Sequence, residues 1–181
     1  PDQPYAYELE IIDFKDQISR YAALLGGQID LANAIAPEQK SLFDNNPKAR
    51  LLRSVTTGWR GFYLNTTKAP FDDVRVRQAF RLLADREDLV ARVLNGEGRV
   101  GNDLYAPHDP TFNHTIPQRQ RNIEEAKALL KEAGHESLEI EATVDLAGAN
   151  AALVFAEQLR PAGIRLNVKQ IDSATFNGPR R

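Results

Sequence analysis

The first candidate for chemistry in this sequence is a glycine-rich stretch, Gly96-Glu97-Gly98-Arg99-Val100-Gly101. It matches the G-x-G-x-x-G fingerprint of dinucleotide-binding proteins, whose glycines bring the backbone close to a pyrophosphate at the N-terminus of a helix. That chemistry requires the motif to lie between a strand and a helix. Here it follows an expected helix and leads into a proline-rich loop, so the sequence favours a flexible helix exit over a nucleotide site.

Three histidines, His108, His114 and His135, could bind a metal ion together with Asp103 and Asp109. A metal site is recognised by tight spacing on one element, such as H-x-x-x-H on a helix, and these residues lack it. The sequence also has no G-x-S-x-G elbow, no P-loop and no cysteine. We therefore expect a protein that is not an enzyme, with no catalytic residues, no metal site and no cofactor.

The composition is that of an ordinary globular protein with 181 residues, 42% of them hydrophobic. The net charge of −2 argues against binding to nucleic acid, which needs a basic excess. No apolar run approaches the roughly 20 residues of a membrane span. The chain starts at Pro1 and contains no methionine, so we expect a processed protein or an excised fragment.

The elements that must position any site begin with a predicted strand over residues 59–65. Alternation places Trp59, Gly61, Tyr63 and Asn65 on one side and Arg60, Phe62 and Leu64 on the other. Trp59 therefore either packs in the core or faces a cleft. Two helices should follow: Asp72 and Asp73 supply the N-cap and negative charge of the first, and Asp85 begins the second. The arginines at 75, 77 and 81 should form a solvated helix face, with an interface to a partner domain as the alternative.

The rest of the chain predicts an α/β fold. Residues 138–144 alternate strictly, 152–159 form a helical stripe, and another strand begins at 164, a spacing typical of a parallel βαβ unit. We also expect strands over 5–14, 29–31 and 50–55, helices over 17–25, 37–45 and 123–133, and a long loop over 102–121. Asp16 should cap the first of these helices, and Asn122 with Glu125 should form a capping box for the last.

Several stretches, in this order, resemble the extracytoplasmic solute-binding proteins of ABC importers, family 5, the oligopeptide, dipeptide and nickel binders. The stretches are Leu24-Leu25-Gly26-Gly27-Gln28-Ile29-Asp30-Leu31, Tyr63-Leu64-Asn65-Thr66, Ala69-Pro70-Phe71-Asp72-Asp73-Val74-Arg75-Val76-Arg77-Gln78-Ala79, Asp85-Arg86-Glu87, Glu125-Ala126-Lys127-Ala128-Leu129-Leu130-Lys131-Glu132-Ala133-Gly134, and Ala162-Gly163-Ile164 through Asp172.

This resemblance implies part of a two-lobe, periplasmic-binding-protein-like fold (type II), with a mixed sheet flanked by helices. Residues 1–62 would be the later segment of the first lobe up to the hinge, and residues 63–181 the first part of the second lobe. The strand over 59–65 would cross the hinge. The implied function is capture of a solute, above all a peptide, for delivery to the membrane permease, in the periplasm or at the cell surface.

The resemblance also implies four ligand-binding residues: Asn33, Trp59, Gly61 and Tyr63. An asparagine amide can bond a peptide backbone, aromatic faces give sequence-tolerant apolar contact, and glycine leaves room for the ligand. Packing in the core or the hinge is the alternative role for each. The alternative function is an interaction or oligomerisation module derived from the same fold, in which the cleft surface forms a partner or homo-oligomer contact.

Overall fold

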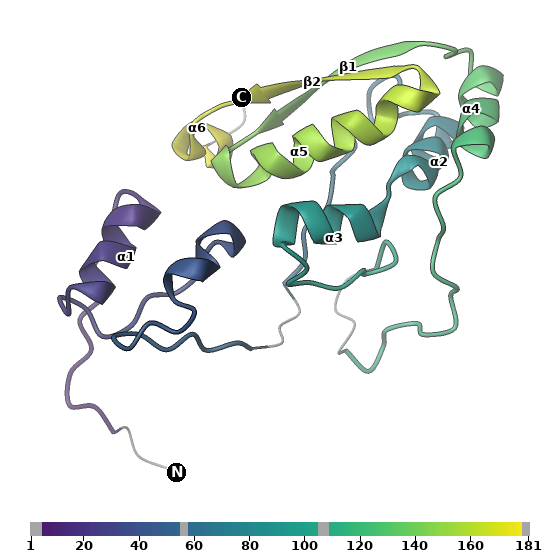
Figure 1. Ribbon diagram of the computed structural model, residues 1–181. Coiled ribbons are helices and arrows are strands. Elements are labelled where there is room, and N and C mark those ends of the chain that lie inside the picture. Colours follow the sequence, from purple (N-terminus) through teal and green to yellow (C-terminus); the bar gives the residue numbers. More distant parts are fainter. Residues whose placement is uncertain (1–4, 55–57, 105–108, 179–181) are drawn as a thin grey trace. The chain divides into compact units, whose positions relative to one another are not determined.

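The computed structural model describes residues 5–54, 58–104 and 109–178. The chain divides into two compact units, Pro1–Ser54 and Val55–Arg181, which are described separately below. Figure 1 labels the helices and strands of both units. Among the described residues, no helix combines the length and the apolar character that a membrane crossing requires.

The first unit contains helix α1 (Gln17–Leu25) and the short 3-10 helix η1 (Pro37–Leu42). Asp16 begins α1 as expected, because its carboxylate accepts the backbone N–H of Ser19 at 2.8 Å. Hydrogen bonds from Ser19 also lower the pKa of Asp16. Gly26 follows the helix, as the sequence predicts.

A single tyrosine holds the core of this unit together. Tyr21 is buried and packs edge-on against the ring of Phe43, with ring centroids 5.4 Å apart. Its hydroxyl accepts the N–H of Ala36 at 3.0 Å and donates to the carbonyl of Ala34 at 3.3 Å. This buried hydroxyl therefore ties α1 to the chain that leads into η1.

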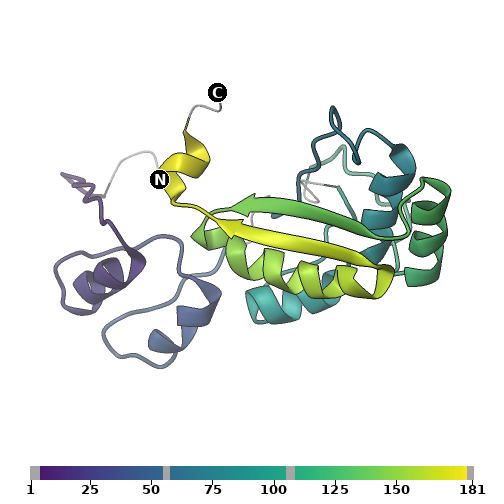
Figure 2. The ribbon, with the colours of Figure 1, turned by 90° about the horizontal axis from the view of Figure 1, so that it is seen from above.

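The second unit is built on the predicted βαβ arrangement, which is confirmed. Strands β1 (Leu138–Val144) and β2 (Ile164–Gln170) pair in parallel, and α5 (Leu146–Leu159) connects them and lies along one face of the pair (Figures 1 and 2). After α5 comes the 3-10 helix η2 (Arg160–Ala162). Gly163 then turns the chain with φ 77°, and a Cβ there would lie 2.8 Å from the carbonyl oxygen of Glu136.

Three further helices complete this unit: α2 (Val74–Leu83), α3 (Arg86–Leu94) and α4 (Ile123–Glu132). Each begins where the sequence predicts, because Asp73, Asp85 and Asn122 accept a backbone N–H of the first turn. The apolar faces of α2 and α4 meet those of α5, η2 and β2 in one core, whereas α3 packs on α5 beside it. The core consists of Val76, Ala79, Phe80, Leu82, Leu83, Ala126, Leu130, Phe155, Leu159, Ala162 and Ile164.

The predictions of strands over 5–14, 29–31, 50–55 and 59–65 are wrong, because none of the described residues in these ranges lies in a strand. Val55, the last residue of the third range, is outside the described residues. A strand needs a hydrogen-bonded neighbour, and among the described residues the only sheet is the β1–β2 pair. The alternation over residues 5–14 also does not give one buried face, because residues 5–13 are all exposed. Tyr5, Tyr7, Leu9 and Ile11 are exposed apolar residues without a sheet partner among the described residues.

Two other expectations need correction. Arg75 and Arg77 are not a purely solvated face: Arg75 donates to the carbonyl of Glu132 at the end of α4 (2.8 Å), and Arg77 donates to the carbonyl of Phe71 (2.7 Å). A further difference is helix α6 (Ser173–Asn177), for which no prediction was made from the sequence. Its sequence signal is Asp172, which caps it and whose pKa is lowered by hydrogen bonds from Thr175.

Candidate functional site

The candidate site is centred on an extended segment, residues 58–65, whose side chains alternate between two environments. On one side, Phe62 stacks on Phe155 of α5, with ring centroids 4.3 Å apart and planes 18° from parallel. Leu64 on the same side packs against the core. Phe62 itself remains 41% exposed, and Trp59 and Tyr63 are 49% and 83% exposed. The segment thus places two aromatic rings at the surface, while the contacts of Phe62 and Leu64 anchor it.

The exposed rings of Trp59 and Tyr63 form a pair. Their centroids are 5.6 Å apart and their planes are tilted by 49°. At that separation the rings contact one another, so a ligand group can lie on them but not between them. The pair therefore offers one continuous apolar surface.

Gly61 allows the indole of Trp59 to lie against the backbone. A Cβ built on Gly61 would come within 2.6 Å of Cζ3 and 3.2 Å of Cε3 of that ring. The space beside Gly61 is thus filled by the neighbouring indole. Any larger residue at position 61 must push the ring aside, which makes glycine a requirement of this arrangement.

Asn33, the fourth predicted ligand-binding residue, belongs to the first unit. It is exposed, and its side-chain oxygen accepts a hydrogen bond from Nη1 of Arg20 at 3.3 Å. The second guanidinium nitrogen of Arg20 donates to the carbonyl of Ala34 at 3.4 Å, where the backbone is left-handed with φ 51°. The structure thus brings Trp59, Gly61 and Tyr63 together within the second unit and places Asn33 in the first.

The glycine-rich motif occupies the exit of α3, as expected. Asn95 ends that helix in the left-handed region, and Gly96 continues with φ 77°. A Cβ on Gly98 would lie 2.6 Å from Cδ1 of Leu94, so this glycine packs against the helix that precedes it. The motif follows a helix, whereas pyrophosphate binding needs it at the start of one.

The described part of the loop after the motif is fastened to α3 by charge. Asp103 accepts from Nε of Arg86 at 3.0 Å and from Nε of Arg119 at 2.9 Å. In the part of the chain that the structure describes, no group of three or more histidines and carboxylates is placed to hold a metal ion. His114 lies beside the ring of Phe112, and His108 is outside the described residues.

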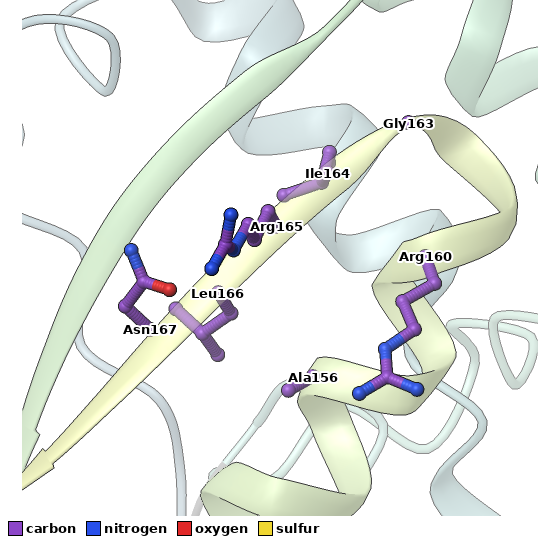
Figure 3. A pocket seen from close by; sticks show the side chains of 7 residues that line it. All are labelled: Ala156, Arg160, Gly163, Ile164, Arg165, Leu166 and Asn167. Carbon is purple, nitrogen blue, oxygen red and sulfur yellow. The ribbon is translucent and has the colours of Figure 1, made fainter.

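A groove of about 550 Å³ lies between the end of α5 and β2 (Figure 3). Its lining consists of Ala156, Arg160, Gly163, Ile164, Arg165, Leu166 and Asn167. It adjoins the first residues of β2, whereas ligands of parallel α/β sheets bind beyond the carboxyl ends of the strands. The groove is therefore a poor candidate for the main site.

Sequence reasoning missed one residue that shapes the candidate site. Phe62 was placed on the face opposite Trp59 by alternation, but no role was assigned to it. The signal was available, since a large aromatic residue directly between two predicted ligand residues must pack on the other side. Its partner Phe155 was predicted only as part of a helix stripe.

Known proteins similar to this chain include the periplasmic oligopeptide-binding protein OppA of Haemophilus influenzae, 33% identical over 127 residues that cover 65% of this chain and 23% of that protein. Heme-binding protein A of the same organism is 32% identical over 120 residues, which cover 66% of this chain and 22% of that protein. The chain therefore spans about a quarter of the length of these relatives or less.

Among solved structures, NikZ from Campylobacter jejuni in complex with Ni(L-His) matches with a TM-score of 0.81 at 21% identity. The match covers 90% of this chain and 36% of that one, and it shows that the fold is shared. The expectation of an α/β, periplasmic-binding-protein-like fold is thus confirmed. All 181 residues match the model for bacterial extracellular solute-binding proteins, family 5 (middle region), and the chain therefore belongs to this family of solute-binding proteins rather than enzymes.

Proposed function

We propose that this chain is part of a binding protein that captures a peptide and delivers it to the membrane permease of an ABC importer. The observation that carries the proposal is the pair of exposed rings, Trp59 and Tyr63, held at the surface by packing on the opposite side of their segment. Apolar surface in water is energetically unfavourable. An aromatic surface that packing keeps exposed is therefore expected where a ligand covers it.

A peptide fits this surface better than a small polar solute. Aromatic faces contact apolar side chains without demanding one sequence, which suits a protein that accepts many peptides. The exposed amide of Asn33 can donate to a peptide carbonyl while its oxygen accepts an N–H. A relative in the same family is named for oligopeptide binding, which supports the same class of solute.

The mechanism is a shift between open and closed forms. Residues 1–62 supply the later segment of the first lobe up to the hinge, and residues 63–181 the first part of the second lobe. A solute that touches both lobes favours the closed form, because only that form satisfies all of its contacts. The complete protein works outside the cytoplasm, secreted or held at the membrane by a lipid anchor.

Calorimetric titration with the peptide Ala-Phe-Ala-Ala tests this proposal, using the complete gene product that contains these residues. Trp59→Ala should weaken binding about tenfold, the equivalent of one lost aromatic contact. Leu153→Ala is the matched control, because Leu153 is an exposed apolar residue of α5 outside the aromatic pair. Unchanged affinity in the Trp59 variant would reject the placement of this residue in the solute site.

The alternative function, an interaction or oligomerisation module, is favoured by one observation. Tyr5, Tyr7, Leu9 and Ile11 are each at least 82% exposed, and exposed apolar residues that belong to no helix or strand favour association with another chain. Size-exclusion chromatography with light scattering separates the two functions. A stable homo-oligomer that forms without peptide and is lost in a Tyr7→Ser, Leu9→Ser variant would support the alternative, and a strict monomer would oppose it.

A further inference from the structure

We infer that Phe62 is a positioning residue for solute binding, which acts by fixing Trp59 and Tyr63 as one surface for an apolar or aromatic side chain of the solute. This inference rests on the proposed function. It adds a residue to the site and names the group that the site accepts.

The first step is the way in which the segment is held. Residues 58–65 belong to no strand, so the regular hydrogen bonding of a sheet does not fix them. Phe62, although 41% exposed, instead stacks on Phe155, a residue that is 4% exposed and lies edge-on to Phe80. Phe80 in turn packs edge-on against Phe71 at 5.1 Å. A continuous series of rings thus links the segment to the buried core.

The second step is the coupling between the two sides of the segment. In an extended chain, neighbouring side chains point in opposite directions. When the stack on Phe155 fixes the ring of Phe62, it therefore fixes the direction in which Gly61 and Tyr63 face. The indole of Trp59 lies against Gly61, so its place depends on the same backbone. Loss of the Phe62 ring should release both exposed rings together.

The third step concerns the chemistry of the surface. The ring centroids of Trp59 and Tyr63 are 5.6 Å apart and the ring planes are tilted by 49°, so the two rings form one bent apolar surface without a gap between them. Such a surface contacts the flat face or the aliphatic body of a side chain. A peptide with an aromatic residue should therefore gain more from an ordered pair than a peptide made of alanine alone.

The experiment uses the fact that Trp59 is the one tryptophan among these 181 residues. Acrylamide quenching and fluorescence anisotropy of the 181-residue chain therefore report on this side chain alone. In Phe62→Ala, quenching should rise and anisotropy should fall, with an unchanged circular dichroism spectrum. Phe62→Tyr keeps the ring and should restore both signals. Phe71→Leu perturbs the far end of the ring series and should leave both signals near wild type.

Binding is then measured on the complete gene product with Ala-Phe-Ala-Ala and with Ala-Ala-Ala-Ala. Phe62→Ala should weaken binding of the first peptide about tenfold and the second much less. Phe62→Leu keeps an apolar side chain but has no ring to stack on Phe155, and it replaces the alanine variant if that variant does not fold. It should lose part of the preference for the aromatic peptide.

Two results would overturn the inference. One is a folded Phe62→Ala variant in which acrylamide quenches Trp59 as in wild type. The other is a folded Phe62→Ala variant that binds both peptides as wild type does while Trp59→Ala weakens binding, an outcome that leaves the proposed function intact. If Trp59→Ala also binds as wild type, the proposed function itself fails.

Discussion

Gln158 should be one of the most sensitive polar positions in the second unit. It is 5% exposed, and its amide joins α5 to the start of α3. Its oxygen accepts the N–H of Asp85 at 3.0 Å, and its nitrogen donates to the carbonyl of Asp85 at 3.1 Å and to the carboxylate of Asp88 at 2.8 Å. We predict that Gln158→Leu, which keeps the volume and removes all three hydrogen bonds, destabilises this unit.

The magnitude follows from these contacts. Two neutral hydrogen bonds at about 1 kcal/mol each and one to a carboxylate at about 2 kcal/mol sum to roughly 4 kcal/mol. Asp88 is partly exposed, so water replaces some of the lost interaction and we expect about 3 kcal/mol. The Asp85 N–H loses its partner at a partly buried helix start, whereas the Asp85 carbonyl still accepts the N–H of Leu89 at 3.1 Å.

Urea unfolding of the 181-residue chain measures this loss, followed by Trp59 fluorescence and far-UV circular dichroism. Trp59 lies in the same unit as Gln158, so its signal reports on the unit that is perturbed. Gln170→Leu is the control, because Gln170 is exposed at the end of β2 and should change stability by less than about 0.5 kcal/mol. A loss below about 1 kcal/mol for Gln158→Leu, with an unchanged denaturant slope, would refute this reasoning.

Three further predictions concern a charge, a helix start and the aromatic pair. A side-chain hydrogen bond from Arg75 lowers the pKa of Asp73 from 3.8 to about 2, so this group stabilises the fold above pH 3.8 and loses that contribution as the pH falls through about 2. Asp73→Asn should therefore flatten the acid limb of a stability–pH curve, and an unaltered limb would contradict this. Asn122→Ala removes the cap of α4 and should lower the free energy of unfolding in urea by about 1 kcal/mol. An unchanged free energy of unfolding would contradict the capping role of Asn122. Gly61→Ala should displace the indole of Trp59 and shift its emission, and a spectrum identical to wild type would contradict the close contact.

Sequence patterns identified those elements whose signals are local. Asp16, Asp73, Asp85 and Asn122 cap helices as predicted, because a cap needs only the N–H groups of the next turn. The parallel β1–β2 pair also followed from the spacing around residues 138–170. The unpaired strands were predicted wrongly, because alternation describes which side of a chain is apolar and cannot reveal whether a neighbouring strand exists.

In the candidate site, too, the sequence predicts local features but not contacts between distant residues. Alternation separates Trp59, Gly61 and Tyr63 from Phe62, and in the structure the rings of Trp59 and Tyr63 contact each other while Phe62 stacks on Phe155. The contact of the indole with Gly61 and the stack of Phe62 on Phe155 depend on three-dimensional packing. Neither is visible in a one-dimensional pattern, since residues 62 and 155 are far apart in the chain.

The central claim is that a peptide lies against Trp59 and Tyr63. Photo-crosslinking tests it most directly, using Ala-Phe-Ala-Ala whose phenylalanine is replaced by p-benzoylphenylalanine, with mass spectrometry to locate the attachment in the complete gene product. The account predicts crosslinks within residues 59–63, suppressed by excess unmodified peptide and reduced in Phe62→Ala. Saturable binding with crosslinks confined to other segments would contradict it.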